Sequence, residues 1–133
     1  MNGPGRDRRR RAEARGRLAE TVAVLLLRLK GYRILARRLR LAAGEIDIVA
    51  ARGRTVAFVE VKARADLASA RDSVGPRQRR RLLNAAALFV ARHPRHAGAD
   101  LRFDLMLVAP RRFSIAWPRH VVDAWRADSS ATE

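Results

Sequence analysis

The chain has 133 residues, a length that suits one domain with one modest core. Its 29 lysines and arginines against 13 acidic residues give a formal charge of +16, which attracts polyanions such as DNA, RNA or anionic lipid. The absence of cysteine excludes disulfides and thiolate metal sites, and the longest uncharged apolar run, Val22 to Leu27, is too short to span a membrane. The N-terminus does not resemble a secretory signal, so we expect a cytoplasmic protein without a membrane partner.

The predicted domain covers residues 6–127. Residues 1–5 and 128–133 are polar or turn-forming, and we expect both ends to be flexible. From about Arg8 to Lys30, apolar residues recur at helix spacing, and Gly31 follows where a helix C-cap would lie. Because apolar residues extend nearly around the later turns, we expect this helix to be covered on more than one side.

Three strand-like runs follow this helix. They read YRILARRLR, GEIDIVAAR and TVAFVEVKA, at residues 32–40, 44–52 and 55–63. The short AAG and RG turns between them predict an antiparallel meander.

The second half of the chain is predicted to alternate between helix and strand. Residues 64–75 form a looser segment, and Pro76 then opens a helix that extends to His93. A fourth strand follows at 100–109, and Pro118 is predicted to open a short helical turn. The predicted fold is α/β, a mixed sheet flanked by helices in the order α-β-β-β-α-β-α, and a crossover helix makes the third and fourth strands parallel.

Charged side chains interrupt the second and third predicted strands. Glu45 and Asp47 share one strand face, as do Glu60 and Lys62, because side chains alternate along a strand. A polar face turned toward water is one explanation. However, apolar residues precede Glu60 and follow Asp47 on the same strand faces, so each carboxylate lies where an apolar face ends. A carboxylate in such a place must be paired with a cation, bind a metal or have a shifted pKa.

The lysine beside these acids is unusual for this chain. Of its 29 basic residues only Lys30 and Lys62 are lysine, and lysine suits a site that needs a compact, adjustable ammonium. Carboxylates from adjacent strands repel unless a cation lies between them, and Mg²⁺ or Mn²⁺ prefers such oxygen ligands. On a strongly basic chain, this pattern predicts phosphodiester chemistry in which a metal polarises the phosphoryl group and Lys62 orients water or offsets charge.

These residues carry a resemblance to a known family. Asp47, a turn and then Glu60-Val61-Lys62 resembles the PD-(D/E)xK nuclease signature, and GEIDIVA with FVEVKAR is similar to the YraN family of small bacterial proteins, which is assigned to that superfamily. The resemblance implies a restriction-endonuclease-like core similar to that of archaeal Holliday-junction resolvases. Other family features occur in the same order, namely Gly16, Glu20, Gly31-Tyr32 and Arg102-Phe103-Asp104.

The resemblance also implies roles for individual residues. Asp47, Glu60 and the backbone carbonyl of Val61 would bind the metal, and Lys62 would be the catalytic lysine. Glu20, on the first helix, matches an acidic residue that completes such sites. It would act as a further metal ligand and catalytic group. The alternative for Glu20 is a buried structural pair with an arginine.

Other polar residues have less defined assignments. Gln78, at the start of the second long helix, would point into the catalytic cleft, although glutamine is also common at helix starts. Asp104 is predicted to be a structural partner of an arginine, and Glu45 to support the strand or the site. Three histidines lack metal-ligand spacing and are predicted to be surface or helix-end residues: His93, His96 and His120.

This chain departs from the family pattern at two positions. Ala19 stands where a glycine commonly precedes the first glutamate, and Arg38 stands where an asparagine often occurs. Neither position belongs to the core of Asp47, Glu60 and Lys62.

We therefore expect a Mg²⁺- or Mn²⁺-dependent endonuclease acting on structured or branched DNA. Cutting opposing strands would require two sites and hence a homodimer. The alternative is a non-catalytic DNA- or RNA-binding module with a structural acidic cluster, although only 5% aromatic residues disfavours a stacking RNA reader. A scaffold for an acidic protein is supported by charge alone. The arginines expected to contact phosphates are Arg8, Arg9, Arg10, Arg77, Arg79, Arg80 and Arg81.

Overall fold

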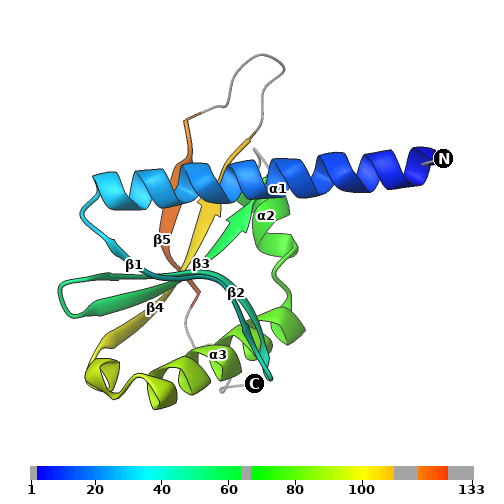
Figure 1. The fold of residues 1–133 in the computed structure, drawn as a ribbon. Helices are drawn as coiled ribbons and strands as arrows, with labels where there is room; N and C mark the ends of the chain where they lie inside the picture. Colours follow the sequence, from blue (N-terminus) through cyan, green and yellow to red (C-terminus); the bar gives the residue numbers. More distant parts are fainter. Residues whose placement is uncertain (1–2, 64–66, 110–116, 126–133) are drawn as a thin grey trace.

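The computed structural model describes residues 3–63, 67–109 and 117–125. The elements are α1 (Pro4–Leu29), β1 (Arg33–Leu41), β2 (Gly44–Arg52), β3 (Thr55–Lys62), α2 (Leu67–Asp72), α3 (Pro76–Arg92), the 3₁₀ turn η1 (Pro94–His96), β4 (Asp100–Leu107) and β5 (Arg119–Trp125). One five-stranded sheet lies between α1 on one face and α3 on the other (Figure 1).

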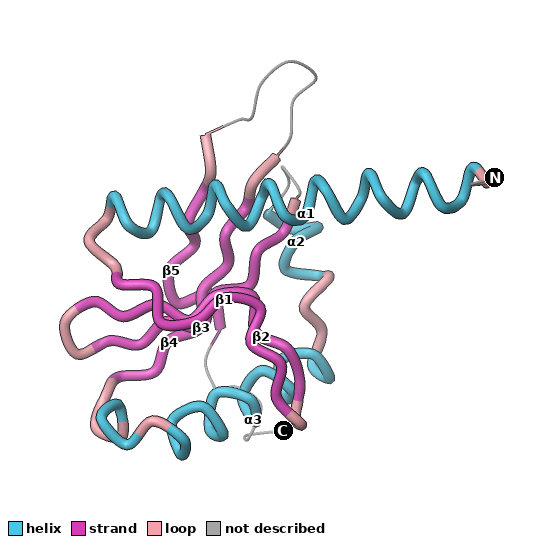
Figure 2. The backbone as a smooth tube through the Cα atoms, viewed as in Figure 1, coloured by secondary structure: helices cyan, strands magenta, loops and turns pink. Residues whose placement is uncertain are grey.

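The sheet has the strand order β1-β2-β3-β4-β5. The first three strands form the predicted antiparallel meander, and β4 pairs parallel to β3 after the chain returns through α2 and α3. β5 pairs antiparallel with β4. Figure 2 shows these strands as one twisted layer between the two long helices. The predicted α/β fold with a mixed sheet is therefore confirmed, and it is consistent with a nuclease-like core.

The first helix begins earlier and is less covered than predicted. It begins at Pro4, so Pro4 and Gly5 lie in its first turn, and its N-terminal half extends beyond the sheet (Figure 1). The expectation that α1 is covered on more than one side is wrong, because only the face toward the sheet is buried. The buried apolar residues are Ala19, Ala23, Val24 and Leu27, whereas Leu18, Leu25 and Leu29 are exposed.

The segment predicted to be loose between β3 and α3 contains the short helix α2. Alanines at 68 and 70 favour helix over irregular structure. At its end the Ser73 hydroxyl donates a hydrogen bond to the Ala70 carbonyl at 2.6 Å.

The chain after Pro118 forms the strand β5, so the helical turn predicted there is wrong. Val121 and Val122 are β-branched and suit a strand. The Trp125 ring stacks on Phe103 of β4 with 5.7 Å between ring centroids. Pairing with β4 therefore determines the conformation of this segment. The segment is too short for its apolar spacing to distinguish a helix from a strand.

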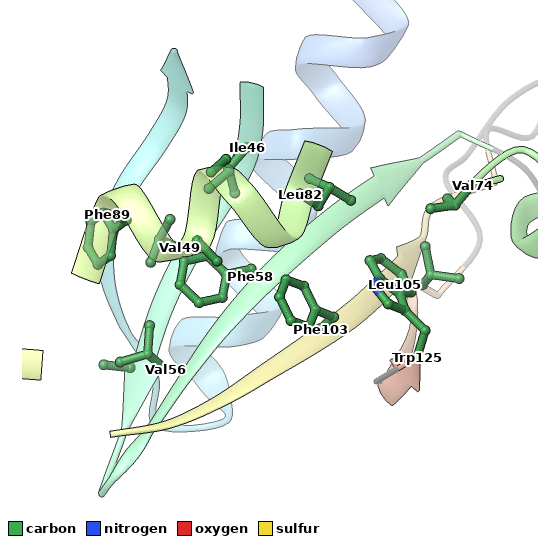
Figure 3. Packing of buried hydrophobic residues seen from close by; sticks show 13 residues of the cluster. Ile46, Val49, Val56, Phe58, Val74, Leu82, Phe89, Phe103, Leu105 and Trp125 are labelled. Carbon is green, nitrogen blue, oxygen red and sulfur yellow. The ribbon is translucent and has the colours of Figure 1, made fainter. Parts of the chain in front are cut away.

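Apolar layers cover both faces of the sheet. On β3, Phe58 points toward α3, where its ring lies 5.6 Å from that of Phe103 and 5.9 Å from that of Phe89 (Figure 3). Its neighbours Ala57 and Val59 belong to the layer under α1. Since both faces are buried, a charged side chain within these strands needs a partner.

Asp104, in the middle of β4, is fully buried and accepts four hydrogen bonds. Its oxygens lie 2.9 Å from both Nε and Nη2 of Arg102, 2.7 Å from His120 Nε2 and 2.9 Å from the backbone nitrogen of Asp123. Burial alone would raise the pKa of Asp104, but these hydrogen bonds outweigh it and lower the pKa below its ordinary value. The predicted pairing of Asp104 with an arginine is confirmed.

The prediction that His120 is a surface or helix-end residue is wrong. Its side chain is 2% exposed, and its Nδ1 lies 2.6 Å from the Nζ of Lys30, at the end of α1. The β4–β5 pairing shifts register nearby, where Asp123 adopts a positive φ of 56° and donates its N–H to Asp104 instead of to a strand partner. The network thus joins α1, β4 and β5.

Replacing Asp104 with alanine should lower the free energy of unfolding by about 3–5 kcal/mol, because Arg102 and His120 lose their buried acceptor. Urea denaturation followed by tryptophan fluorescence would measure this change. Asp100→Ala, at the exposed start of the same strand, is the matched control and should change stability by less than about 0.5 kcal/mol. Equal, small effects of both substitutions would show that the network does not stabilise the sheet.

Candidate active site

The end of the β2–β3 ladder explains why Asp47 occurs within a strand. Backbone pairing between these strands extends from Arg52 and Thr55 to Ile48 and Val59. Beyond that pair, the N–H of Val61 donates to Oδ2 of Asp47 at 2.9 Å. A side-chain carboxylate therefore takes the place of a backbone acceptor, and this brings Asp47 beside the end of β3.

Glu60 is buried next to Asp47 with little compensation for its charge. The residue is 8% exposed, and its Oε1 lies 3.6 Å from the Nζ of Lys62. Its other oxygen, Oε2, is buried and has no hydrogen-bond partner among the described residues. An unpartnered buried carboxylate oxygen is costly, and it is the kind of group that a bound cation would satisfy.

The two carboxyl groups perturb each other. Burial and then the charge of Asp47 raise the pKa of Glu60 to about 8, against the opposing charge of Lys62. Burial also raises the pKa of Asp47, although the hydrogen bond from Val61 N–H offsets part of that effect. The pair therefore holds a proton that isolated carboxyl groups would lose, and a cation is the natural replacement for it.

Glu20 approaches the same region from α1 and is already neutralised. It is 6% exposed, and its carboxylate accepts hydrogen bonds from Nε of Arg38 at 2.8 Å and from Nε of Arg37 at 3.3 Å. The structural alternative for Glu20, a buried pair with arginine, is thus present. Neither arginine was identified from the sequence, because no local pattern shows which of the many arginines reaches this acid.

A cavity of about 410 Å³ opens between α1 and the strand ends. Asp47 and Val61 line it, together with Glu20 and Arg38, whereas Glu60 and Lys62 do not. The remaining lining residues come from α1 and the β1–β2 hairpin: Glu13, Gly16, Arg17, Arg40 and Glu45. A ligand entering this cavity would therefore meet the Asp47 side of the acid pair first.

Comparison with known proteins identifies the family of this chain. The profile of the uncharacterised protein family UPF0102 matches residues 19–108, which include Asp47 and Glu60 to Lys62. The chain belongs to the UPF0102 family. This is the YraN family of the resemblance, so that expectation is confirmed.

Individual UPF0102 proteins are similar over most of their length. The chain is 59% identical to one from Parvibaculum lavamentivorans over 111 residues, which cover 84% of this chain and 80% of the relative. It is 53% identical to one from Methylorubrum extorquens over 121 residues, 91% of each chain. A third, from Maricaulis maris, is 51% identical over 125 residues, 94% of this chain and 95% of the relative.

No helix among the described residues of this UPF0102 member is long and apolar enough to cross a membrane.

The backbone of this UPF0102 member explains one departure from the family pattern. Arg38 has a positive φ of 49°, in the left-handed region that asparagine adopts more readily than most residues. An asparagine there would relieve the backbone, whereas arginine instead supplies the hydrogen bond to Glu20. The second departure, Ala19, is buried in the layer between α1 and the sheet.

The other predicted site residues of this UPF0102 member lie outside the acid pair. Gln78 is in the first turn of α3, which packs on the opposite sheet face from α1, and it does not line the cavity. Glu45 is exposed, and its Oε2 lies 3.7 Å from Nε of Arg40. His93 and His96 lie at the end of α3 and in η1, as predicted.

The predicted phosphate-contacting arginines divide into two kinds. Arg79 is half-buried, since its Nε donates to the Val74 carbonyl at 3.0 Å and its guanidinium lies 5.8 Å from the Trp125 ring centre. The others are exposed, three on the projecting part of α1 and three at the start of α3: Arg8, Arg9, Arg10, Arg77, Arg80 and Arg81.

The donor set fits a divalent metal that retains several waters. Among residues 3–63, 67–109 and 117–125, no three histidine or acidic side chains gather as a preformed metal site. Mg²⁺ is commonly held by only one or two carboxylates with water completing its shell, and Asp47 with Glu60 supplies two. The unpartnered Glu60 Oε2 is the observation that favours a cation here.

In EDTA, the free energy of unfolding should fall as the pH rises from about 4.5 to about 8. The pKa of Glu60 is raised in the folded state, so folding retains a proton that the unfolded chain releases over this range. In wild type, the free energy of unfolding should fall by at most about 1.4 kcal/mol per pH unit over this range, and Glu60→Gln should abolish this dependence. Urea denaturation at several pH values would measure it, with Glu45→Gln as control. Identical profiles for wild type and Glu60→Gln would contradict the raised pKa.

Proposed function

We propose that this UPF0102 member is a metal-dependent endonuclease that hydrolyses phosphodiester bonds in structured or branched DNA. The observation that carries the proposal is the buried carboxyl pair of Asp47 and Glu60 with Lys62 as its nearby cation. Their perturbed protonation, together with the unpartnered Oε2 of Glu60, distinguishes this pair from the other buried acids. The resemblance of the same residues to the PD-(D/E)xK signature supports phosphodiester hydrolysis as the reaction class.

Each residue of the pair has a role that its surroundings support. Asp47 and Glu60, with the carbonyl of Val61, would hold Mg²⁺ or Mn²⁺. When bound, the metal would polarise the scissile phosphoryl group and lower the pKa of a water ligand. Lys62, 3.6 Å from Glu60, is placed to orient that water or to offset negative charge in the transition state.

The distribution of exposed arginines supports a nucleic-acid substrate. The basic N-terminal half of α1 projects on the side of the molecule where α3 begins, so both arginine clusters lie toward the same end (Figure 1). The cavity beside Asp47 also contains residues from α1. A DNA backbone held by these clusters would pass near the acid pair. A homodimer would let two such sites cut opposing strands.

Cleavage of labelled linear, nicked, flapped and four-way-junction DNA in Mg²⁺, Mn²⁺ or EDTA tests the proposal. We expect metal-dependent cutting that falls by about 10²–10³-fold in Lys62→Ala, because the lysine acts on developing charge. Asp47→Asn, which keeps an acceptor for the Val61 N–H, should lose both cutting and the rise in Tm that Mn²⁺ gives wild type. Glu45→Gln, on the same strand and cavity, should retain both properties.

The outcome of this experiment also decides the alternative function. Tight DNA or RNA binding without cutting in either metal, and without stabilisation by Mn²⁺, would show a binding module whose acid pair is structural. The neutralisation of Glu20 by two arginines is the observation that favours this alternative.

The exposed arginines at the start of α3 should determine the salt dependence of binding. Arg80→Ala with Arg81→Ala should weaken DNA binding and reduce the slope of log K against log salt by about 0.9 for each lost phosphate contact. Fluorescence anisotropy at several salt concentrations would measure both. Arg28→Ala with Arg92→Ala removes the same charge from the opposite end of the molecule. Equal slope changes in the two variants would contradict a local DNA contact at the start of α3.

A further inference from the structure

A second cavity, of about 290 Å³, lies at the opposite end of the sheet from Asp47. Arg33 at the start of β1, Arg54 in the β2–β3 turn, and Arg95 and His96 of η1 contribute to its wall. Asp47 and the β2–β3 turn are separated by most of β2, about 20 Å at the rise of a strand. We refer to this cavity as the arginine pocket, and it is distinct from the candidate active site.

The arginine pocket concentrates positive charge without compensation. Arg33, Arg54 and Arg95 are exposed, and none of them forms an ion pair with any carboxylate of the described chain. Its described lining contains no acidic residue, and Ala51 and Val56 contribute buried apolar surface. The cavity beside Asp47 differs, because two of its arginines are paired with carboxylates, Arg38 with Glu20 and Arg40 with Glu45.

Backbone hydrogen bonds hold the pocket walls in place. The N–H of Asp100 donates to the carbonyl of Arg54 at 2.8 Å, which joins the start of β4 to the β2–β3 turn. In η1, the N–H of His96 donates to the His93 carbonyl at 2.9 Å. The His93 ring stacks on Phe89 of the core with 4.2 Å between centroids. The cationic side chains therefore extend from anchored backbone, which lowers the ordering cost of binding an anion.

We propose that the arginine pocket binds a phosphate group. Guanidinium groups present paired donors that match phosphate oxygens, and they keep their charge at any physiological pH. The volume lies near the lower limit of about 300 Å³ for small-molecule sites, which suits one phosphate or phosphodiester group rather than a large ligand.

The histidine adds a neutral hydrogen-bonding group to this site. Burial, followed by neighbouring charges of which Arg95 is the first, lowers the pKa of His96. A bound phosphate would reverse the local charge and make protonation of that ring easier. The proposal does not depend on nuclease activity, since binding is measured in EDTA without cleavage.

Titration of the full chain with inorganic phosphate, followed by ¹H–¹⁵N NMR, tests the arginine pocket. We expect shifts at the amides of Arg54, His96 and Gly98 rather than at Val61, and at least tenfold weaker binding in Arg33→Gln with Arg95→Gln. Arg28→Gln with Arg71→Gln removes the same charge from exposed helix positions outside the pocket and should bind like wild type. Arg54→Gln, in the turn, provides the same test if the double variant unfolds.

The same variants distinguish the source of the phosphate. A short DNA duplex in EDTA, measured by fluorescence anisotropy, forms the second arm of the experiment. If the pocket variant weakens duplex binding more than the control variant does, the pocket holds a backbone phosphate. If the pocket variant weakens only the binding of inorganic phosphate, the ligand is a free phosphate or a small phosphate ester. Equal losses of phosphate affinity in both double variants would overturn the proposal. Amide shifts that do not cluster at the pocket would also overturn it.

Discussion

The hydrogen bond from the Val61 N–H to the Asp47 carboxylate sets the character of the candidate active site. Backbone pairing of β2 and β3 stops at Ile48 and Val59, and the next donor along β3 is satisfied by a side chain. This arrangement fixes a carboxylate at the ladder end, beside the buried Glu60. The hydrogen bond also stabilises the charged form of Asp47 beside this second acid, because it opposes the effect of burial on the pKa of Asp47.

The described chain contains other buried acids, and the comparison isolates the pair. Asp104 has Arg102, His120 and a backbone donor, and its pKa is lowered. Glu20 has two arginines. Glu60 has one nearby cation, Lys62 at 3.6 Å, an Oε2 that accepts no hydrogen bond from the described residues, and a pKa raised to about 8 by burial and by Asp47. In an arginine-rich chain, compensation was available elsewhere, so its shortage at Glu60 is the feature on which the proposed metal site rests.

Sequence reasoning predicted elements whose determinants are local. The meander follows from its short turns, and α3 from Pro76 and its periodic apolar face. The error at β5 arose because a seven-residue segment carries too little periodicity, and its conformation depends on pairing with β4. The burial of His120 was missed for the same reason, since its partners Lys30 and Asp104 are distant in sequence.

The candidate site shows the same division between local and distant determinants. Asp47, Glu60 and Lys62 could be identified because strand alternation and motif spacing are local. The partners of Glu20 could not, since nothing in the sequence says which arginines of so many will reach a given acid. The positive φ of Arg38 is likewise not visible in the sequence alone.

The net charge and the local geometry act at different ranges. A charge of +16 attracts any polyanion and is screened over about 10 Å at moderate salt, so it cannot by itself select where a phosphate binds. Selection requires places where cations converge without matched acids, or where acids converge without enough cations. The described chain has a place of each kind, at opposite ends of β2 and β3. The strands β2 and β3 therefore separate the acid pair proposed to bind a metal from the arginine pocket proposed to bind a phosphate.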